Sequence, residues 1–320
     1  MDAHRALVAD PAFRADVLAG LAAPIPAVPA RWLYDRRGSE LFEEITKLPE
    51  YYPTRTETAL LERYSGEIAS MLGTGEAVVE FGSGSSTKTP ILLRAVKPCA
   101  YVPIDISGDF LREAALALQA EFPDLPVLPV EADFMRRLDL PAEINDAPKL
   151  GFFPGSTIGN LVARTAVDLL RAMKETLGEG SRLVIGMDRI KDVEVLLAAY
   201  GDAAGVTAAF NLNLLHRINA ELDGTIPVEA FRHRAIWNDE MSRIEMHLEA
   251  LGDVAFTVAG VGFSLRAGKT IHTENSHKYG HRDSRLLLRA AGWGVVREWT
   301  DEKQWFSIIL AEAEPPRFAP

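Results

Sequence analysis

Residues 78–93, VVEFGSGSSTKTPILL, are the most informative segment of this sequence for its fold class. A short, mostly apolar run is followed by a glycine-rich turn and then by a segment with helical spacing, which predicts a buried strand, a tight turn and a helix. A phosphate-binding P-loop needs glycine where Thr87 stands, because its backbone curls around a phosphate. The dinucleotide fingerprint G-x-G-x-x-G fails at the same residue. The turn therefore lacks the glycine that both phosphate-binding motifs require at this position, and its ligand must be inferred from other residues.

This stretch opens a series in which short apolar runs alternate with helical segments. The apolar runs are residues 77–81, 101–106, 125–131, 149–154 and 181–188. Strands that are apolar on both faces and alternate with helices predict an α/β fold, a Rossmann-like doubly wound parallel sheet. A helix near residues 284–292 and two late strands, 295–301 and 305–313, are expected to complete the same sheet.

The alternation stops after Asp188, where two helical stretches lead into strands of period two. We therefore expect a Rossmann-like domain of residues 57–188 plus 277–320. A second, α+β domain for substrate binding is expected from residues 1–56 plus 189–276. At the N-terminus we expect a helix over residues 4–21. A later helix is expected after Tyr52, where Thr54 and Glu57 have the spacing of a capping box.

The composition narrows the class of ligand. The chain has 320 residues, is 48% hydrophobic and carries a net charge of −11, which argues against nucleic acid or an anionic membrane as partner. The single cysteine, Cys99, excludes an intrachain disulfide and a cysteine-based metal site. No signal peptide and no apolar run of about 18 residues is apparent. We expect a cytoplasmic monomer that binds small molecules.

Polar residues at the ends of the predicted strands indicate what the turn binds. Glu80, Gly82 and Gly84 follow the first strand, and Asp105 ends the second. In this fold an acid at the second strand end lies where a carboxylate can accept from both hydroxyls of a ribose. Such an aspartate also often serves only as a helix cap, and a glycine-rich turn can be no more than a tight turn.

A third polar position follows the next strand, at Asp133 and Phe134. There a carboxylate can accept from the adenine amino group while the aromatic ring covers the base. Asp188 ends a later strand like a Walker B aspartate, but apolar strands that end in Asp are common. Glycines with a ribose acid and an adenine acid favour S-adenosylmethionine, and hence a methyltransferase over a dehydrogenase.

Six segments of the chain resemble one family, the histidine Nα-methyltransferases of ergothioneine biosynthesis. The segments are YDRRGSELFEEITKLPEYYPTRTE, EFGSGSSTKT, GSTIGNL, AYGDAAGVTAAFNLNLLHRIN, RIEM and HTENSHKY. The resemblance implies a two-domain enzyme that moves three methyl groups from S-adenosylmethionine to the α-amino group of L-histidine, giving hercynine. A similar module occurs in ovothiol-forming enzymes.

The resemblance also implies which residues bind each substrate. The cofactor contacts that the resemblance implies are Gly82, Lys88, Asp105, Asp133 and Phe134, with Lys88 on the methionine carboxylate. Gly84 is added to them from the glycine-rich turn. The expected histidine contacts are Tyr34, Tyr52, Asn160, Tyr200, Met246, Glu274 and Ser276. Asn160 and Tyr200 are the expected catalytic residues: the Asn160 amide can accept from the amine and donate to the carboxylate, and Tyr200 can donate to the carboxylate. Without the resemblance, Asn160 would also suit a helix cap near Ala163.

The imidazole ring needs a different pair of groups. Glu274 and Ser276 have i, i+2 spacing, so on a strand they face the same side and offer an acceptor and a donor. Tyr52 can complete this cage, while Met246 and, less specifically, Tyr34 would pack around the ring. Because the sulfonium is already a strong electrophile, no general base is assigned.

Three alternatives remain open from the sequence. His272, His277 and His281 suggest a metal site, but Gly280 argues against one continuous helix there, so no metal is expected. A methyltransferase of the same scaffold could act on another amino acid, such as tryptophan. A binding module without catalysis would bind both ligands and form no product.

Overall fold

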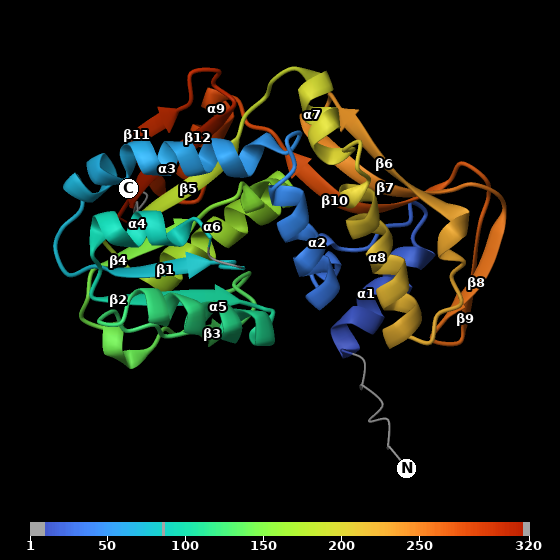
Figure 1. The fold of residues 1–320 in the computed structure, drawn as a ribbon, viewed down its shortest axis with the longest axis horizontal. Helices are drawn as coiled ribbons and strands as arrows, with labels where there is room; N and C mark the ends of the chain where they lie inside the picture. Colours follow the sequence, from blue (N-terminus) through green and yellow to red (C-terminus); the bar gives the residue numbers. More distant parts are fainter. Residues whose placement is uncertain (1–9, 85–86, 316–320) are drawn as a thin grey trace, which may run out of the picture. The chain divides into compact units, whose positions relative to one another are not determined.

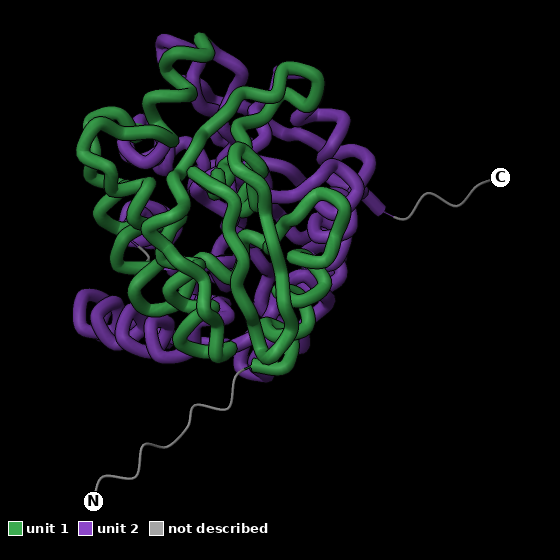
Figure 2. The backbone as a smooth tube through the Cα atoms, turned by 90° about the vertical axis from the view of Figure 1, so that its right-hand side faces the viewer, with its two compact units in different colours: residues 1–51, 192–275 green, residues 52–191, 276–320 purple. Residues whose placement is uncertain are grey.

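The computed structural model of this protein describes residues 10–84 and 87–315. The chain divides into two compact units (Figure 2). Unit 1 comprises residues 1–51 and 192–275, and unit 2 comprises residues 52–191 and 276–320. These boundaries differ by a few residues from those expected from the sequence. Within the two described ranges, no helix is both long enough and apolar enough to cross a membrane.

Unit 2 is built on a seven-stranded sheet of order β11-β12-β5-β4-β1-β2-β3 (Figure 1). Its strands are β1 (Ala77–Phe81), β2 (Ala100–Asp105), β3 (Val130–Glu131), β4 (Lys149–Phe153), β5 (Arg182–Asp188), β11 (Trp293–Thr300) and β12 (Phe306–Ala313). Neighbours among β1 to β5 run parallel, and β12 runs antiparallel to both β5 and β11. The predicted α/β sheet is confirmed, including its two C-terminal strands.

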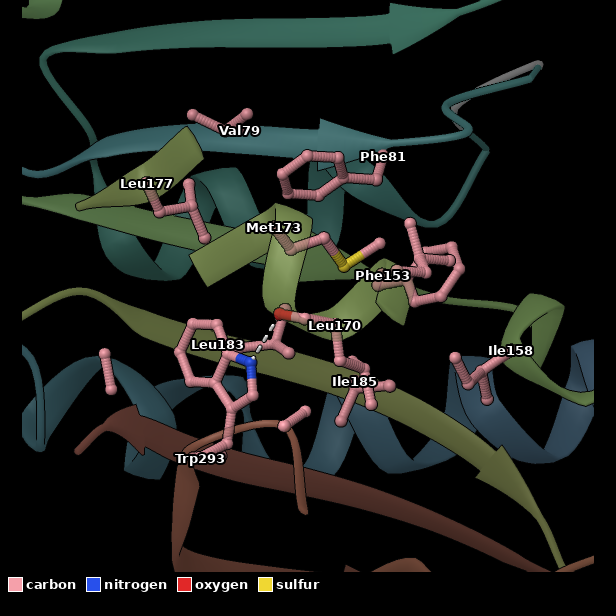
Figure 3. Close-up of a cluster of buried hydrophobic side chains, with 14 of the residues drawn as sticks. Val79, Phe81, Phe153, Ile158, Leu170, Met173, Leu177, Leu183, Ile185 and Trp293 are labelled. Carbon is pink, nitrogen blue, oxygen red and sulfur yellow. Dashed lines mark hydrogen bonds between the residues drawn. The ribbon is translucent and has the colours of Figure 1, made fainter. Parts of the chain in front are cut away.

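Helices cover both faces of this sheet. Successive residues of a strand point to opposite sides, and the apolar residues on both sides must be buried. Val78 packs in a cluster with helices α3 (Tyr52–Ser70), α4 (Thr89–Val96) and α5 (Gly108–Glu121). Val79 packs on the other face with α6 (Ala163–Leu177) and α9 (His281–Ala290). In this second cluster the indole of Trp293 donates to the Leu170 carbonyl at 2.9 Å (Figure 3). Two short 3₁₀ helices, η2 (Ala142–Ile144) and η3 (Thr157–Asn160), lie between strands.

Unit 1 contains a three-stranded sheet of order β10-β7-β6 and a separate hairpin. Its strands are β6 (Phe231–Asn238), β7 (Arg243–Ala250), β8 (Val254–Val258), β9 (Val261–Leu265) and β10 (Thr270–His277). Its helices are α1 (Pro11–Ala22), η1 (Ala30–Leu33), α2 (Arg36–Thr46), α7 (Val193–Tyr200), α8 (Val206–Glu221) and η4 (Val228–Ala230). Asp10 caps α1, and residues 4–9 of the expected N-terminal helix lie outside the described residues. This unit has the predicted α+β character.

The predicted capping box at Thr54 and Glu57 is wrong. Helix α3 begins at Tyr52, so Thr54 lies inside its first turn. The carboxylate of Glu57 accepts instead from the backbone N–H of Gly155, at 3.0 and 2.9 Å, and pairs with Lys88. A local spacing rule failed here because a donor 98 residues away captures this carboxylate.

Candidate functional site

The glycine turn after β1 lies at the carboxyl end of the sheet, where α/β folds bind ligands. Gly82 and Gly84 have φ values of +70° and +49°, in the left-handed region that favours glycine. The Gly84 N–H donates to Oδ2 of Asp105 at 3.0 Å, and the Ser107 N–H donates to Oδ1 at 2.9 Å. Asp105 therefore braces the turn, and its oxygens keep lone pairs for a ligand's hydroxyls. Residues 85–86 of the turn lie outside the described residues.

The ring of Phe134 lies against this turn. A Cβ added to Gly82 would sit 3.4 Å from the ring, which is van der Waals distance, so the ring covers this side of the turn. The ring also meets Phe81 edge-on at 6.3 Å between centroids and Phe153 at 6.0 Å. Asp133 accepts from the Met135 N–H at 3.0 Å. The structure thus brings Gly82 and Phe134 together, while the role of the ring in covering a base stays a prediction.

Lys88 has a partner that the sequence did not indicate. Its ammonium pairs with Glu57, which is 1% exposed and fixed by the Gly155 N–H. A Cβ on Gly186 would lie 2.0 Å from Oε1 of Glu57, so a side chain at this strand position would displace the carboxylate from its present place. An ammonium has three donors, and Lys88 can therefore bind Glu57 and a ligand carboxylate together.

Glu80, on β1 beside the turn, is a buried acid. The hydroxyls of Thr89 and Tyr101 both donate to its Oε2, the first at 2.7 Å. Burial raises the pKa of Glu80 to about 7, although the two hydroxyls act in the opposite direction. Glu80 therefore joins β1 to β2 and α4.

A second polar group lies at the end of β5, and we call it the Asp188 cluster: Tyr52, Asp188, Lys191, Ser276 and Lys278. The Tyr52 hydroxyl donates to Oδ2 of Asp188 at 2.7 Å and accepts from Lys191 at 2.6 Å. Lys278 lies 2.7 Å from the same Oδ2 and donates to Oγ of Ser276 at 2.8 Å. Two predicted substrate residues, Tyr52 and Ser276, are thus held by one network.

The Asp188 cluster holds two lysines against one aspartate, with all three side chains at most 3% exposed. Burial lowers the pKa of Lys191 to about 8, since desolvation disfavours the ammonium more than Asp188 favours it. Burial alone would raise the pKa of Asp188, but Lys278 and Lys191 hold it below its usual range. The sequence analysis did not single out Lys191 or Lys278. The one signal for this cluster was Asp188 at the end of a predicted strand.

Asn160 ends η3, after β4. The N-cap residue of helix α6 is Val162, so Asn160 does not occupy the N-cap position. The neighbouring Gly159 carbonyl accepts from Nδ1 of His277 at 2.8 Å, which ties η3 to the end of β10. The alternative of Asn160 as a helix cap is therefore wrong.

In unit 1, an aromatic row connects two other predicted substrate residues. The Tyr34 ring contacts Phe42 at 5.6 Å, Phe42 contacts Tyr51 at 6.2 Å, and Tyr51 contacts Tyr200 at 6.2 Å between centroids. Tyr200 ends α7, and its carbonyl accepts from Nε2 of His233 at 2.8 Å. The structure thus links Tyr34 and Tyr200 within this unit through rings that the sequence did not single out.

Met246 and Glu274 lie on the sheet of unit 1, on β7 and β10. Both are buried, at 2% and 8% exposure. The Thr273 hydroxyl donates to the Met246 carbonyl at 3.0 Å, which places these two predicted positions on neighbouring strands. Glu274 and Ser276 lie on the same strand, β10, which is the condition under which their i, i+2 spacing puts them on one side.

The three histidines of the metal alternative do not gather. His272, His277 and His281 are bonded to Glu274, Gly159 and Glu298, respectively. His277 lies on β10, whereas His281 begins α9, so no single helix presents both.

Among the described residues, a different trio has its potential ligand atoms within 4.8 Å: Glu245, His247 and His272. Arg243 donates to one oxygen of Glu245 through two nitrogens, at 2.8 and 2.6 Å, which already balances the charge. The rings of His247 and His272 stack at 4.7 Å and 19°, so their lone pairs do not converge on one point. This trio is therefore poorly arranged for an ion, and the absence of a metal stays a prediction.

Comparison with known proteins identifies the family to which this sequence is similar. Residues 13–313 match the model of a family described as histidine-specific methyltransferase, SAM-dependent. The histidine N-alpha-methyltransferase of Mycolicibacterium smegmatis is 40% identical over 94% of both chains. Ergothioneine biosynthesis protein 1 of Neurospora crassa is 30% identical over 89% of this chain and 33% of its own length. The L-tryptophan methyltransferase of Psilocybe serbica is 27% identical over 95% and 93%.

The family match extends across both units, from α1 to the last residue of β12. It includes the glycine turn and all five residues of the Asp188 cluster. The relative at 40% identity is matched over nearly its whole length. This chain belongs to the family of histidine-specific, S-adenosylmethionine-dependent methyltransferases.

Proposed function

We propose that the protein transfers three methyl groups from S-adenosylmethionine to the α-amino group of L-histidine, giving hercynine, the first step of ergothioneine biosynthesis. The observation that carries this proposal is the 40% identity to a histidine N-alpha-methyltransferase over 94% of both chains. The family description supports the same donor and the same substrate. A cytoplasmic location and a monomeric state stay predictions.

S-adenosylmethionine is assigned to unit 2. The Asp105 carboxylate, braced by two backbone N–H groups, suits the ribose diol. Phe134, packed against Gly82, suits one face of the adenine, and Asp133 is proposed for its amino group. Lys88 is proposed for the methionine carboxylate, and Gly84 gives the backbone its close approach.

The family pattern proposes the following residues as contacts of histidine. In unit 2, Asn160 is proposed to accept from the amine and to donate to the carboxylate, while Tyr52 and Ser276 are proposed near the ring. In unit 1 the proposed contacts are Tyr34, Tyr200, Met246 and Glu274. Of these, Tyr200 is proposed to donate its hydroxyl to the substrate carboxylate, as one of two catalytic residues with Asn160.

The chemistry needs alignment more than activation. The α-ammonium of histidine titrates above neutral pH, so only a minor fraction of the amine is neutral near pH 7, and its proton can leave to water. The amine lone pair then forms the new nitrogen–carbon bond as the methyl–sulfur bond breaks, and sulfur keeps that electron pair. Holding these atoms in line is the enzyme's main contribution. Loss of a proton precedes each of the three transfers.

The proposal is tested by mass spectrometry with purified protein, S-adenosylmethionine and each of the twenty amino acids. Histidine is expected to gain up to three methyl groups. Because a relative is named for tryptophan, methylation of tryptophan alone would support the second candidate. Binding of both ligands without any mass gain would instead support the binding module.

The role of Asn160 is tested by Asn160→Ala. We expect this variant to lose activity while calorimetry shows nearly unchanged affinity for S-adenosylmethionine, because η3 is held by His277 through the backbone of Gly159. An equal loss of cofactor affinity would show that Asn160 does not serve histidine.

A further inference from the structure

Glu57, on α3, holds a buried negative charge beside the proposed cofactor site. Its side chain is 1% exposed. The Gly155 N–H donates to both of its oxygens, at 3.0 and 2.9 Å, and the Lys88 ammonium donates to Oε2. Both oxygens therefore accept, as an ionised carboxylate does. The place of this charge depends on a backbone donor, on a cation and on the absence of a side chain at Gly186.

Lys88 is the more exposed member of this pair. Its side chain is 14% exposed, against 1% for Glu57. Lys88 is the N-cap residue of α4 and follows the glycine turn directly. Because an ammonium has three N–H donors, Lys88 can contact Glu57 and a ligand at the same time. A ligand group that approaches Lys88 is therefore also exposed to the negative charge behind it.

We propose that the Glu57–Lys88 pair makes this site selective for a zwitterion, so that Glu57 determines a preference for a methionine moiety with both its α-ammonium and its α-carboxylate. This inference rests on the proposed function, in which Lys88 contacts the methionine carboxylate. Lys88 alone would attract any carboxylate. With Glu57 the pair has no net charge, so a ligand that brings only a carboxylate leaves an excess negative charge in a largely desolvated place. The α-ammonium of the ligand cancels this excess.

Glu80 is a further acidic group close to the pair, and its charge state must be controlled in the experiment. Burial raises the pKa of Glu80 to about 7, and the charges of Lys88 and Glu57 act on it in opposite directions. At pH 6 Glu80 is therefore mostly neutral, whereas an α-ammonium and an α-carboxylate keep their charges. Measurements at pH 6 report the charge of Glu57 with little contribution from Glu80.

The experiment compares two ligands, S-adenosylhomocysteine and its des-amino analogue, in which hydrogen replaces the α-ammonium group. Titration calorimetry at pH 6 gives the Kd of each ligand for the wild-type protein and for Glu57→Gln. Glutamine keeps an acceptor for the Gly155 N–H and removes the charge. The ratio of the Kd of the analogue to that of S-adenosylhomocysteine is expected to be about 10-fold smaller in Glu57→Gln, because the coupling between two close charges is lost.

The matched control is Glu76→Gln. Glu76 is 5% exposed, accepts from the Gly73 N–H at 2.9 Å and pairs with Arg182, so it has the same kinds of partner as Glu57. It lies just before β1, at the strand end opposite to the glycine turn. This variant should keep the Kd ratio within about twofold of the wild-type value. Glu57→Asp, which retains the charge, is expected to keep most of the wild-type ratio.

An unchanged ratio in Glu57→Gln, or a ratio in Glu57→Asp as small as that in Glu57→Gln, would overturn the inference. Binding of S-adenosylhomocysteine to the wild-type protein would still leave the proposed function intact. A wild-type protein that binds neither ligand would overturn both. Should Glu57→Gln fail to fold, Gly186→Ala takes its place, because the added Cβ displaces the same carboxylate. A wild-type ratio in Gly186→Ala would then overturn the inference.

Discussion

Nζ of Lys278 lies 2.7 Å from Oδ2 of Asp188, and both side chains are at most 1% exposed. Lys191 contacts the other oxygen of the same carboxylate. One buried aspartate therefore compensates two buried lysines at the carboxyl end of β5. Removal of the Asp188 carboxylate would leave two buried ammonium groups without a counter-charge. Removal of either lysine would leave one lysine paired with Asp188.

Asp188→Asn is accordingly expected to destabilise the protein by about 3 to 5 kcal/mol, because it leaves buried ammonium groups without a counter-charge. Urea unfolding measures this change. The control is Asp168→Asn, whose carboxylate is 58% exposed and lies 3.5 Å from Arg171, and whose cost should stay within about 0.5 kcal/mol. Equal costs for the two variants would contradict the assigned role of Asp188.

Glu80 is expected to make the stability depend on pH. Its pKa is about 7 in the folded protein against an ordinary 4.5, so the folded state binds the proton more tightly. Stability should therefore fall as pH rises from 4.5 through 7, by a total on the order of 3 kcal/mol. Glu80→Gln keeps an acceptor for Thr89 and Tyr101 and should flatten this part of the curve. Urea unfolding at several pH values measures both curves. Equal pH dependence of the wild-type protein and Glu80→Gln would contradict this role of Glu80.

Lys88→Met is expected to weaken the binding of S-adenosylmethionine by about 10-fold or more, because a charge-assisted hydrogen bond to the methionine carboxylate is lost. Titration calorimetry measures this affinity. Arg94→Met is the control, since Arg94 lies on α4 in the same region but is 61% exposed. The assignment of Lys88 fails if both variants bind the cofactor equally well.

Glu274→Ala is expected to reduce discrimination between histidine and other amino acids, because it removes the proposed acceptor for the imidazole N–H. Competition between histidine and tryptophan, followed by mass spectrometry of the methylated products, measures the preference. The control is Glu249→Ala. It removes a carboxylate of β7 that pairs with Arg232 of β6 and has no proposed contact with the substrate. Unchanged selectivity in Glu274→Ala would place ring recognition elsewhere.

A strong chelator is expected to leave the rate of methyl transfer unchanged. Glu245 is neutralised by Arg243, and the stacked rings of His247 and His272 do not converge on an ion. Elemental analysis of the purified protein should accordingly find no stoichiometric metal. Loss of activity on chelation that is restored by one added metal would reverse this expectation.

Much of the fold follows from local patterns. The apolar runs around Val78 and Val184 have residues that must be buried on both faces, and only a sheet covered by helices on both sides can do this. The left-handed backbone at Gly82 and Gly84 needs glycine and little else from the tertiary structure. The assignment of the cofactor to residues at these strand ends stays a prediction.

By itself, therefore, the sequence determined the doubly wound sheet, its glycine turn and the order of strand-end acids, because these depend on periodicity and on backbone conformation. Only the tertiary structure decided the partners of Glu57 and Tyr52, which come from 98 and 136 residues away. It also decided that Asp188, Lys191 and Lys278 form one buried cluster. Buried charges must find counter-charges wherever the folded chain brings them, and no local spacing encodes that choice.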